Sequence, residues 1–83
     1  MIAAYILTTV KQDGKIHQTL EQMKKIRNIS SVSVVSGTYD LMIETKVNEL
    51  NELFDVTNQI QDHPSIIKTS THVIEQEIYA NHT

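Results

Sequence analysis

The chain has 83 residues, a mass of 9.5 kDa and no cysteine, and its ten acidic and seven basic residues give a net charge of −3. This length leaves room for one hydrophobic core, and the lack of cysteine excludes a disulfide framework and a thiolate metal site. The excess of acidic residues argues against a surface that binds duplex DNA. No apolar run is long enough to span a membrane, and no basic signal leader opens the chain. We therefore expect a cytoplasmic protein with one domain, residues 1–83.

The first 28 residues predict a strand and a helix. Residues 2–10 alternate between two sets of side chains, as expected of a β-strand. One set is Ala4, Ile6 and Thr8, and the other is Ala3, Tyr5, Leu7 and Thr9. After the turn signal Asp13-Gly14, apolar residues spaced by four and three predict a helix over residues 15–27. These residues are Ile16, Leu20, Met23 and Ile26. Asn28 can then end the helix in the left-handed conformation.

Residues 31–63 predict a β-hairpin followed by a second helix. Residues 31–36 and 41–47 alternate with a period of two, and Ser36-Gly37-Thr38-Tyr39-Asp40 interrupts the pattern as a short turn. Asn48 is a good N-cap for a helix that ends before Pro64. The expected buried face of this helix is Leu50, Leu53, Phe54, Thr57 and Ile60.

Residues 66 to about 79 predict a long last strand with a bulge. We expect one side of this strand to carry Ile66, Ile74 and Ile78, and the opposite side to carry Ile67, Val73 and Tyr79. The resulting order βαββαβ predicts the α+β class and a ferredoxin-like plan, in which a four-stranded antiparallel sheet carries both helices on one face. Because both sides of the first and last strands are substantially apolar, we expect dimerisation through the other face. A monomer with a partly exposed apolar face is the alternative.

The residues that usually carry catalysis or bind metals form no recognisable set. None of the four histidines (His17, His63, His72 and His82) has metal-ligand spacing. Glu75 and Glu77 share one side of a strand, but a solvated edge suits them better than an acid–base pair. We therefore expect no catalytic residue, no metal and no cofactor, and the chain is not expected to be an enzyme.

The segment 36–40 is the strongest candidate for binding. Gly37 permits a backbone turn with positive φ and close approach of another molecule. Tyr39 brings an aromatic face and a hydroxyl, and Asp40 brings a carboxylate that suits the ammonium group of a small zwitterion. A plain hairpin turn, in which Gly and Asp are ordinary residues, is the alternative.

Two stretches, SVSVVSGTYDLMIETKV (31–47) and HPSIIKTSTHVI (63–74), resemble the effector domain of Lrp/AsnC-type transcription regulators, the RAM domain. That family has a G-x-Y/F-D hairpin and a T-x-T/S last strand after a P-x turn, and the resemblance covers essentially all 83 residues. It implies dimers assembled into rings such as octamers, with amino-acid effectors held where dimers meet. The ligand-binding residues that it implies are Gly37, Thr38, Tyr39, Asp40, Thr69, Ser70 and Thr71.

Full-length members of that family carry an N-terminal helix-turn-helix domain, whereas Met1 here opens directly on the first strand. The resemblance therefore implies a stand-alone regulatory and oligomerisation module that binds neither DNA nor membranes. Such a module would modulate transcription or metabolism through effector binding, and it could assemble with full-length regulators. Two other classes stay open: a small dimeric ferredoxin-like enzyme of monooxygenase or isomerase type, and an assembly partner that binds no ligand.

Overall fold

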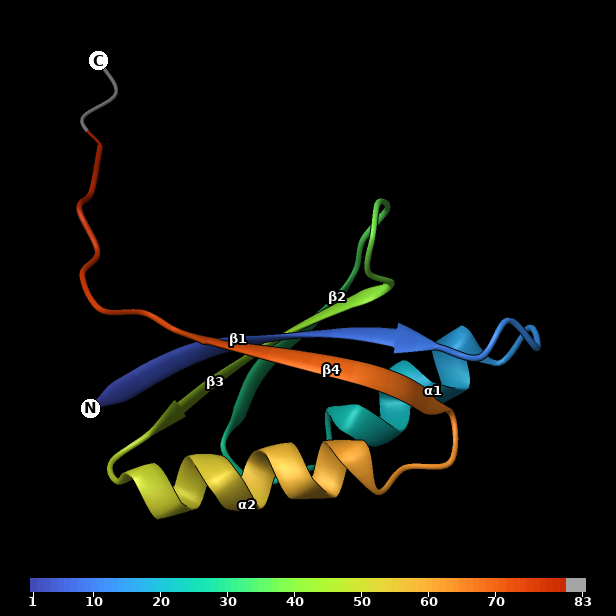
Figure 1. The fold of residues 1–83 in the computed structure, drawn as a ribbon, viewed down its shortest axis with the longest axis horizontal. Coiled ribbons are helices and arrows are strands. Elements are labelled where there is room, and N and C mark those ends of the chain that lie inside the picture. The colour runs from blue at the N-terminus through green and yellow to red at the C-terminus, as the bar shows by residue number, and fades with distance from the viewer. Residues whose placement is uncertain (81–83) are drawn as a thin grey trace.

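The computed structural model describes residues 1–80 and has the predicted ferredoxin-like order. Its elements are β1 (Ile2–Val10), α1 (Ile16–Met23), β2 (Ile29–Val34), β3 (Leu41–Val47), α2 (Leu50–Gln61) and β4 (Ile66–Val73). The four strands form one sheet in the order β2-β3-β1-β4, and every neighbouring pair is antiparallel. Both helices lie on the same face of this sheet (Figure 1). No helix in residues 1–80 is long and apolar enough to cross a membrane.

The core lies between the sheet and the two helices, on what we call the helix face. Its main cluster is Ala4, Ile6, Met23, Ile43, Val47, Leu53, Val56 and Ile60. The alternation predicted for β1 and β3 is confirmed, because their even- and odd-numbered side chains, respectively, are buried there. The other face, which we call the open face, carries Ala3, Tyr5, Leu7, Thr9, Met42, Glu44, Lys46, Lys68, Ser70 and His72.

The first helix is shorter than predicted and ends at Met23 instead of residue 27. The chain tightens there, because the amides of Lys25 and Ile26 bond to carbonyls three residues back. The expected left-handed residue is confirmed, since Asn28 has a φ of +73°. β2 then starts at Ile29, two residues earlier than predicted.

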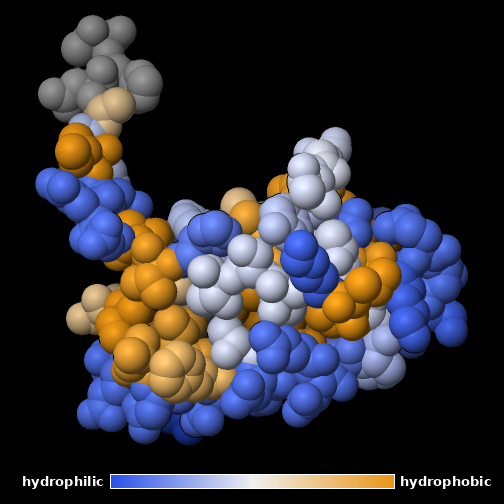
Figure 2. Space-filling model, viewed as in Figure 1, coloured by the Kyte–Doolittle hydropathy of each residue, from blue (hydrophilic) through white to orange (hydrophobic). Residues whose placement is uncertain are grey.

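The second helix begins at Leu50, with Glu49 and not Asn48 in the N-cap position. The Glu52 carboxylate accepts the amide hydrogens of Asn48 and Glu49 at 3.1 and 2.9 Å. The predicted buried face was wrong in part, because Leu53, Val56 and Ile60 are buried. Leu50 and Phe54 are half exposed, and with Val73 they form an apolar patch where α2 meets the end of β4 (Figure 2). We call this set the α2–β4 patch.

The last strand ends at Val73, six residues before the predicted end. Only Ala3 and Ile2 of β1 remain beyond the pair of Ala4 with Val73, so residues 76–79 have no neighbouring strand to pair with, and the amide of Ile74 makes the final bond to the Ala3 carbonyl at 2.9 Å. The predicted bulge is confirmed: Thr9 pairs with Lys68 but Val10 pairs with Ile66, which leaves Ile67 as the extra residue. The bulge places Ile66 and Val73 on the same side, contrary to the predicted division of this strand.

Two buried threonines on the helix face differ in hydrogen bonding. The Thr45 hydroxyl donates to the Asn28 carbonyl oxygen at 2.7 Å, whereas the Thr8 hydroxyl has no partner within residues 1–80. Because an unpaired buried hydroxyl is destabilising, we expect Thr8→Val to raise the free energy of unfolding by about 1 kcal/mol and Thr45→Val to lower it by a similar amount. Urea unfolding of the two variants beside the parent checks this, and a Thr8→Val variant less stable than the parent would contradict it.

Candidate functional site

The predicted binding loop, residues 36–40, connects β2 to β3 and stands clear of the body of the domain (Figure 1). Gly37 has a φ of +141°, in the region that favours glycine, as its sequence position indicated. A Cβ built at this position would have open space around it. The main chain of the loop is therefore open to close approach by another molecule.

Asp40 has a structural role that the sequence did not reveal. Its carboxylate oxygen Oδ2 accepts the Val10 amide hydrogen at 2.9 Å and lies 3.4 Å from the Gln12 amide nitrogen Nε2. The Asp40 backbone amide also donates to the Thr8 carbonyl at 2.8 Å. These bonds tie the base of the loop to the end of β1, so that the negative charge is held at this end of the sheet.

The predicted contacts in the last strand point to both faces of the sheet. Thr69 and Thr71 pair with Thr8 and Ile6 and share the helix face, whereas Ser70 pairs with Leu7 and lies on the open face. The Thr69 hydroxyl accepts a hydrogen bond from the Gln61 side-chain amide at 2.9 Å. Within one chain, residues 69–71 therefore do not form a single binding surface.

The loop and the β4 segment lie at the same end of the sheet but on opposite sides of β1. Leu41, directly after the loop, pairs with Thr8, and Thr8 pairs with Thr69. Since neighbouring strands are about 4.8 Å apart, roughly 10 Å separates the two segments. Four surface hollows formed by residues 1–80 are lined by other residues. One copy alone therefore does not enclose a ligand between the two segments.

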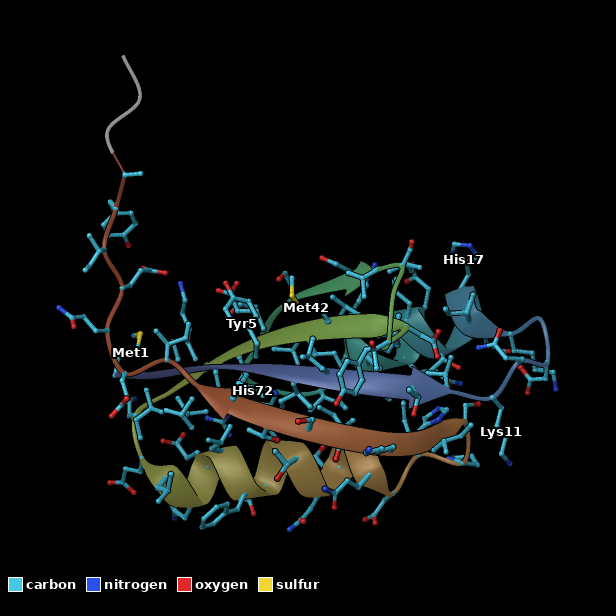
Figure 3. The ribbon with its side chains drawn as sticks, turned by 45° about the horizontal axis from the view of Figure 1, so that its top comes forward. Met1, Tyr5, Lys11, His17, Met42 and His72 are labelled. Atoms are coloured by element: carbon cyan, nitrogen blue, oxygen red, sulfur yellow. The ribbon has the colours of Figure 1, made fainter. Side chains whose placement is uncertain are left out.

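The open face carries a row of polar side chains that crosses the three neighbouring strands β3, β1 and β4. Tyr5 and Met42 point away from α2 (Figure 3), and Tyr5 pairs with Glu44 on one side and His72 on the other. The negative charge of the neighbouring Glu44 carboxylate raises the pKa of the Tyr5 phenol above its ordinary value, because it disfavours the phenolate. The His72 ring contacts the Ser70 hydroxyl at 3.0 Å. The row follows from the antiparallel register of β3, β1 and β4, which the alternation within any one strand does not reveal.

Histidines and carboxylates do not gather into a metal-binding group. Within residues 1–80 no three side chains of His, Asp or Glu lie close enough together to hold an ion. His63 instead has an intrachain partner on each ring nitrogen, since Nδ1 accepts the Ser65 amide hydrogen at 3.1 Å and Nε2 contacts the Gln22 side-chain oxygen. His82 lies outside the described residues.

Comparison with known proteins agrees with the resemblance seen in the sequence. The family model of the Lrp/AsnC ligand binding domain matches residues 3–83. A search of the curated proteins finds no match. Among solved structures, FFRP-DM1 is 29% identical with a TM-score of 0.81, over 89% of this chain and 99% of that one. The hypothetical protein PHS023 from Pyrococcus horikoshii is 28% identical with a TM-score of 0.81, and the match covers both chains completely.

A third structure, the transcriptional regulator NMB0573 from Neisseria meningitidis in complex with L-Met, has the same fold. It is 14% identical with a TM-score of 0.82, over 95% of this chain and 53% of that one. Because the family model covers nearly every residue and the fold agrees, the chain belongs to the Lrp/AsnC ligand-binding domain family.

Proposed function

We propose that this chain is an effector-binding and assembly module of the Lrp/AsnC type, which binds a free amino acid and does not itself bind DNA. The observation that carries the proposal is the family match over residues 3–83. The L-Met complex of NMB0573 supports an amino acid as the class of effector, since that protein shares the fold. The net charge of −3 supports the absence of DNA binding, because duplex DNA requires a basic surface. In this proposal the module is regulatory and has no catalytic residue.

The same proposal includes assembly of several copies. Two copies pack through their open faces, where Leu7 and Met42 are half-buried in the isolated chain. The α2–β4 patch is a second apolar surface, on the other layer of the domain, through which dimers can join into a ring such as an octamer. A full-length relative with matching surfaces could join the same ring.

The effector site of this proposal combines the loop Gly37–Asp40 with the strand segment Thr69–Thr71. The ligand carboxylate accepts hydrogen bonds from backbone N–H groups around Gly37, where no other atoms crowd the main chain. The ligand ammonium group binds the Asp40 carboxylate, which uses Oδ2 for the Val10 amide and has a second oxygen to offer. A neighbouring copy completes the site, since one chain leaves the two segments on opposite sides of β1.

Asp40→Asn tests this site without removing the structural bond. An asparagine side chain keeps a carbonyl oxygen for the Val10 amide but loses the negative charge. Because a charge-assisted hydrogen bond is about twice as strong as a neutral one, we expect amino-acid binding to weaken about tenfold. The measurement is a thermal-shift screen of the free amino acids, L-Met included, followed by calorimetry with the best ligand.

The matched control is Asp62→Asn, which removes an exposed acid at the end of α2. This variant should bind as the parent does. If Asp40→Asn also binds as tightly as the parent, the effector site lies elsewhere. If none of the amino acids stabilises the parent, the effector proposal itself is wrong and an assembly partner without a ligand becomes the better reading.

A further inference from the structure

A hollow of about 180 Å³ lies on the helix side of the domain, between the turn after α1 and residues 52–59 of α2. Its volume is several times the roughly 30 Å³ that one water molecule occupies in the liquid. The hollow is lined by Arg27, Asn28, Glu52, Asp55, Val56 and Gln59. It shares no residue with the proposed effector site at the loop 37–40 and the segment 69–71.

The acidic wall of the hollow belongs to α2. Glu52, Asp55 and Gln59 recur at spacings of three and four, so they line one face of this helix. The nearly fully buried Val56 lies beside them and supplies apolar lining. The Glu52 carboxylate is held in place by the hydrogen bonds that it accepts from the backbone amides of Asn48 and Glu49 at the start of the helix. Asp55 is exposed and forms no ion pair within 4.0 Å in the described part of the chain.

The basic wall of the hollow is anchored to the sheet. Arg27 directly precedes Asn28, whose carbonyl oxygen accepts hydrogen bonds from the Thr45 hydroxyl at 2.7 Å and the Lys46 amide at 3.3 Å. The backbone at Arg27 is therefore fixed against β3. Like Asp55, Arg27 has no carboxylate within 4.0 Å among residues 1–80. A cation and an anion thus line the same hollow without neutralising each other directly.

We propose that this hollow binds a small zwitterion, whose carboxylate is held by Arg27 and whose ammonium group is held by Asp55. A guanidinium matches a carboxylate with two parallel hydrogen bonds, and a carboxylate is a strong acceptor for an ammonium group. The Asn28 and Gln59 side chains offer further donors and acceptors on the two walls. Glu52 adds a second carboxylate to the acidic wall, but it already accepts hydrogen bonds from the amides of Asn48 and Glu49. Arg27 and Asp55 are therefore the two charges of the hollow without a partner among residues 1–80, and a ligand that has both a carboxylate and an ammonium group matches both.

Two-dimensional NMR titration of the parent chain with glycine and β-alanine tests the site. We expect saturable shifts of the backbone amides of Asn28 and Gln59, and we expect Arg27→Gln and Asp55→Asn each to weaken binding at least tenfold. Acetate and methylamine, which carry one charge each, should bind at least tenfold more weakly than glycine. Matched controls are Lys25→Gln and Asp62→Asn, which change exposed charges on the neighbouring turn and helix outside the hollow and should leave the titration unchanged.

The outcomes separate this site from the proposed effector site. Because the hollow shares no residue with the loop, Asp40→Asn should leave the shifts of Asn28 and Gln59 intact, whatever happens to effector binding. The inference is overturned if acetate or methylamine binds as tightly as glycine. It is also overturned if both Arg27→Gln and Asp55→Asn bind like the parent, or if the zwitterions shift only amides of residues 36–40.

Discussion

Ile43→Ala is expected to lower the free energy of unfolding by about 2–5 kcal/mol. Ile43 lies in the middle of β3, is fully buried, and pairs with Ile6 on one side and Val32 on the other. Removing its side chain leaves a cavity that the two flanking strands and the helices above them cannot fill without moving. Since a domain of this kind has only about 5–15 kcal/mol of stability, this single change removes a large share of it.

The matched control is Ile67→Ala. It deletes the same atoms from the bulge residue of β4, whose side chain is 65% exposed. We expect a change within about 0.5 kcal/mol, as for other surface positions. Urea unfolding should be compared at one protein concentration, because the stability of an oligomer depends on concentration. Equal losses in the two variants would show that the core lies elsewhere than between the sheet and the helices.

Leu7→Lys is expected to convert the proposed dimer into monomers. Leu7 lies in the centre of the open face, between Met42 on β3 and Ser70 on β4. When two open faces pack together, the variant brings an ammonium group from each copy into the contact. Removing an unpaired ion from water costs several kcal/mol. Because each 1.4 kcal/mol of lost binding free energy raises the Kd about tenfold, we expect the affinity of the dimer to fall by at least about a hundredfold.

Sedimentation velocity of the parent and the variant at micromolar concentration measures this change. Because Leu7 is outside the buried cluster, the far-ultraviolet circular dichroism of Leu7→Lys should match that of the parent. Ile67→Lys places the same charge at the bulge of the edge strand β4, three residues along the strand from Ser70, and should keep the mass of the parent. A parent that sediments as a monomer would refute the dimer, and a Leu7→Lys variant with the parent's mass would move the interface to another surface.

The order of the elements and the two faces of β1 and β3 could be predicted from the sequence. Both are local properties, because side chains alternate along a strand and repeat at three and four residues along a helix. Gly37 and Asn28 were also predictable, since positive φ is a property of the single residue. The family resemblance rested on equally local motifs, and the match over residues 3–83 confirmed it.

Other features were decided by the tertiary structure, because they depend on residues far apart in the chain. β4 ends at Val73 because only two residues of its partner β1 remain beyond Ala4. The packing of α2 against the sheet buries Leu53, Val56 and Ile60, and it leaves Leu50 and Phe54 half exposed. Asp40 meets Val10 only after β3 has paired with β1. Arg27 and Asp55 come to one hollow because the turn after α1 and the helix α2 cover the same face of the sheet, and no spacing along the chain encodes that proximity.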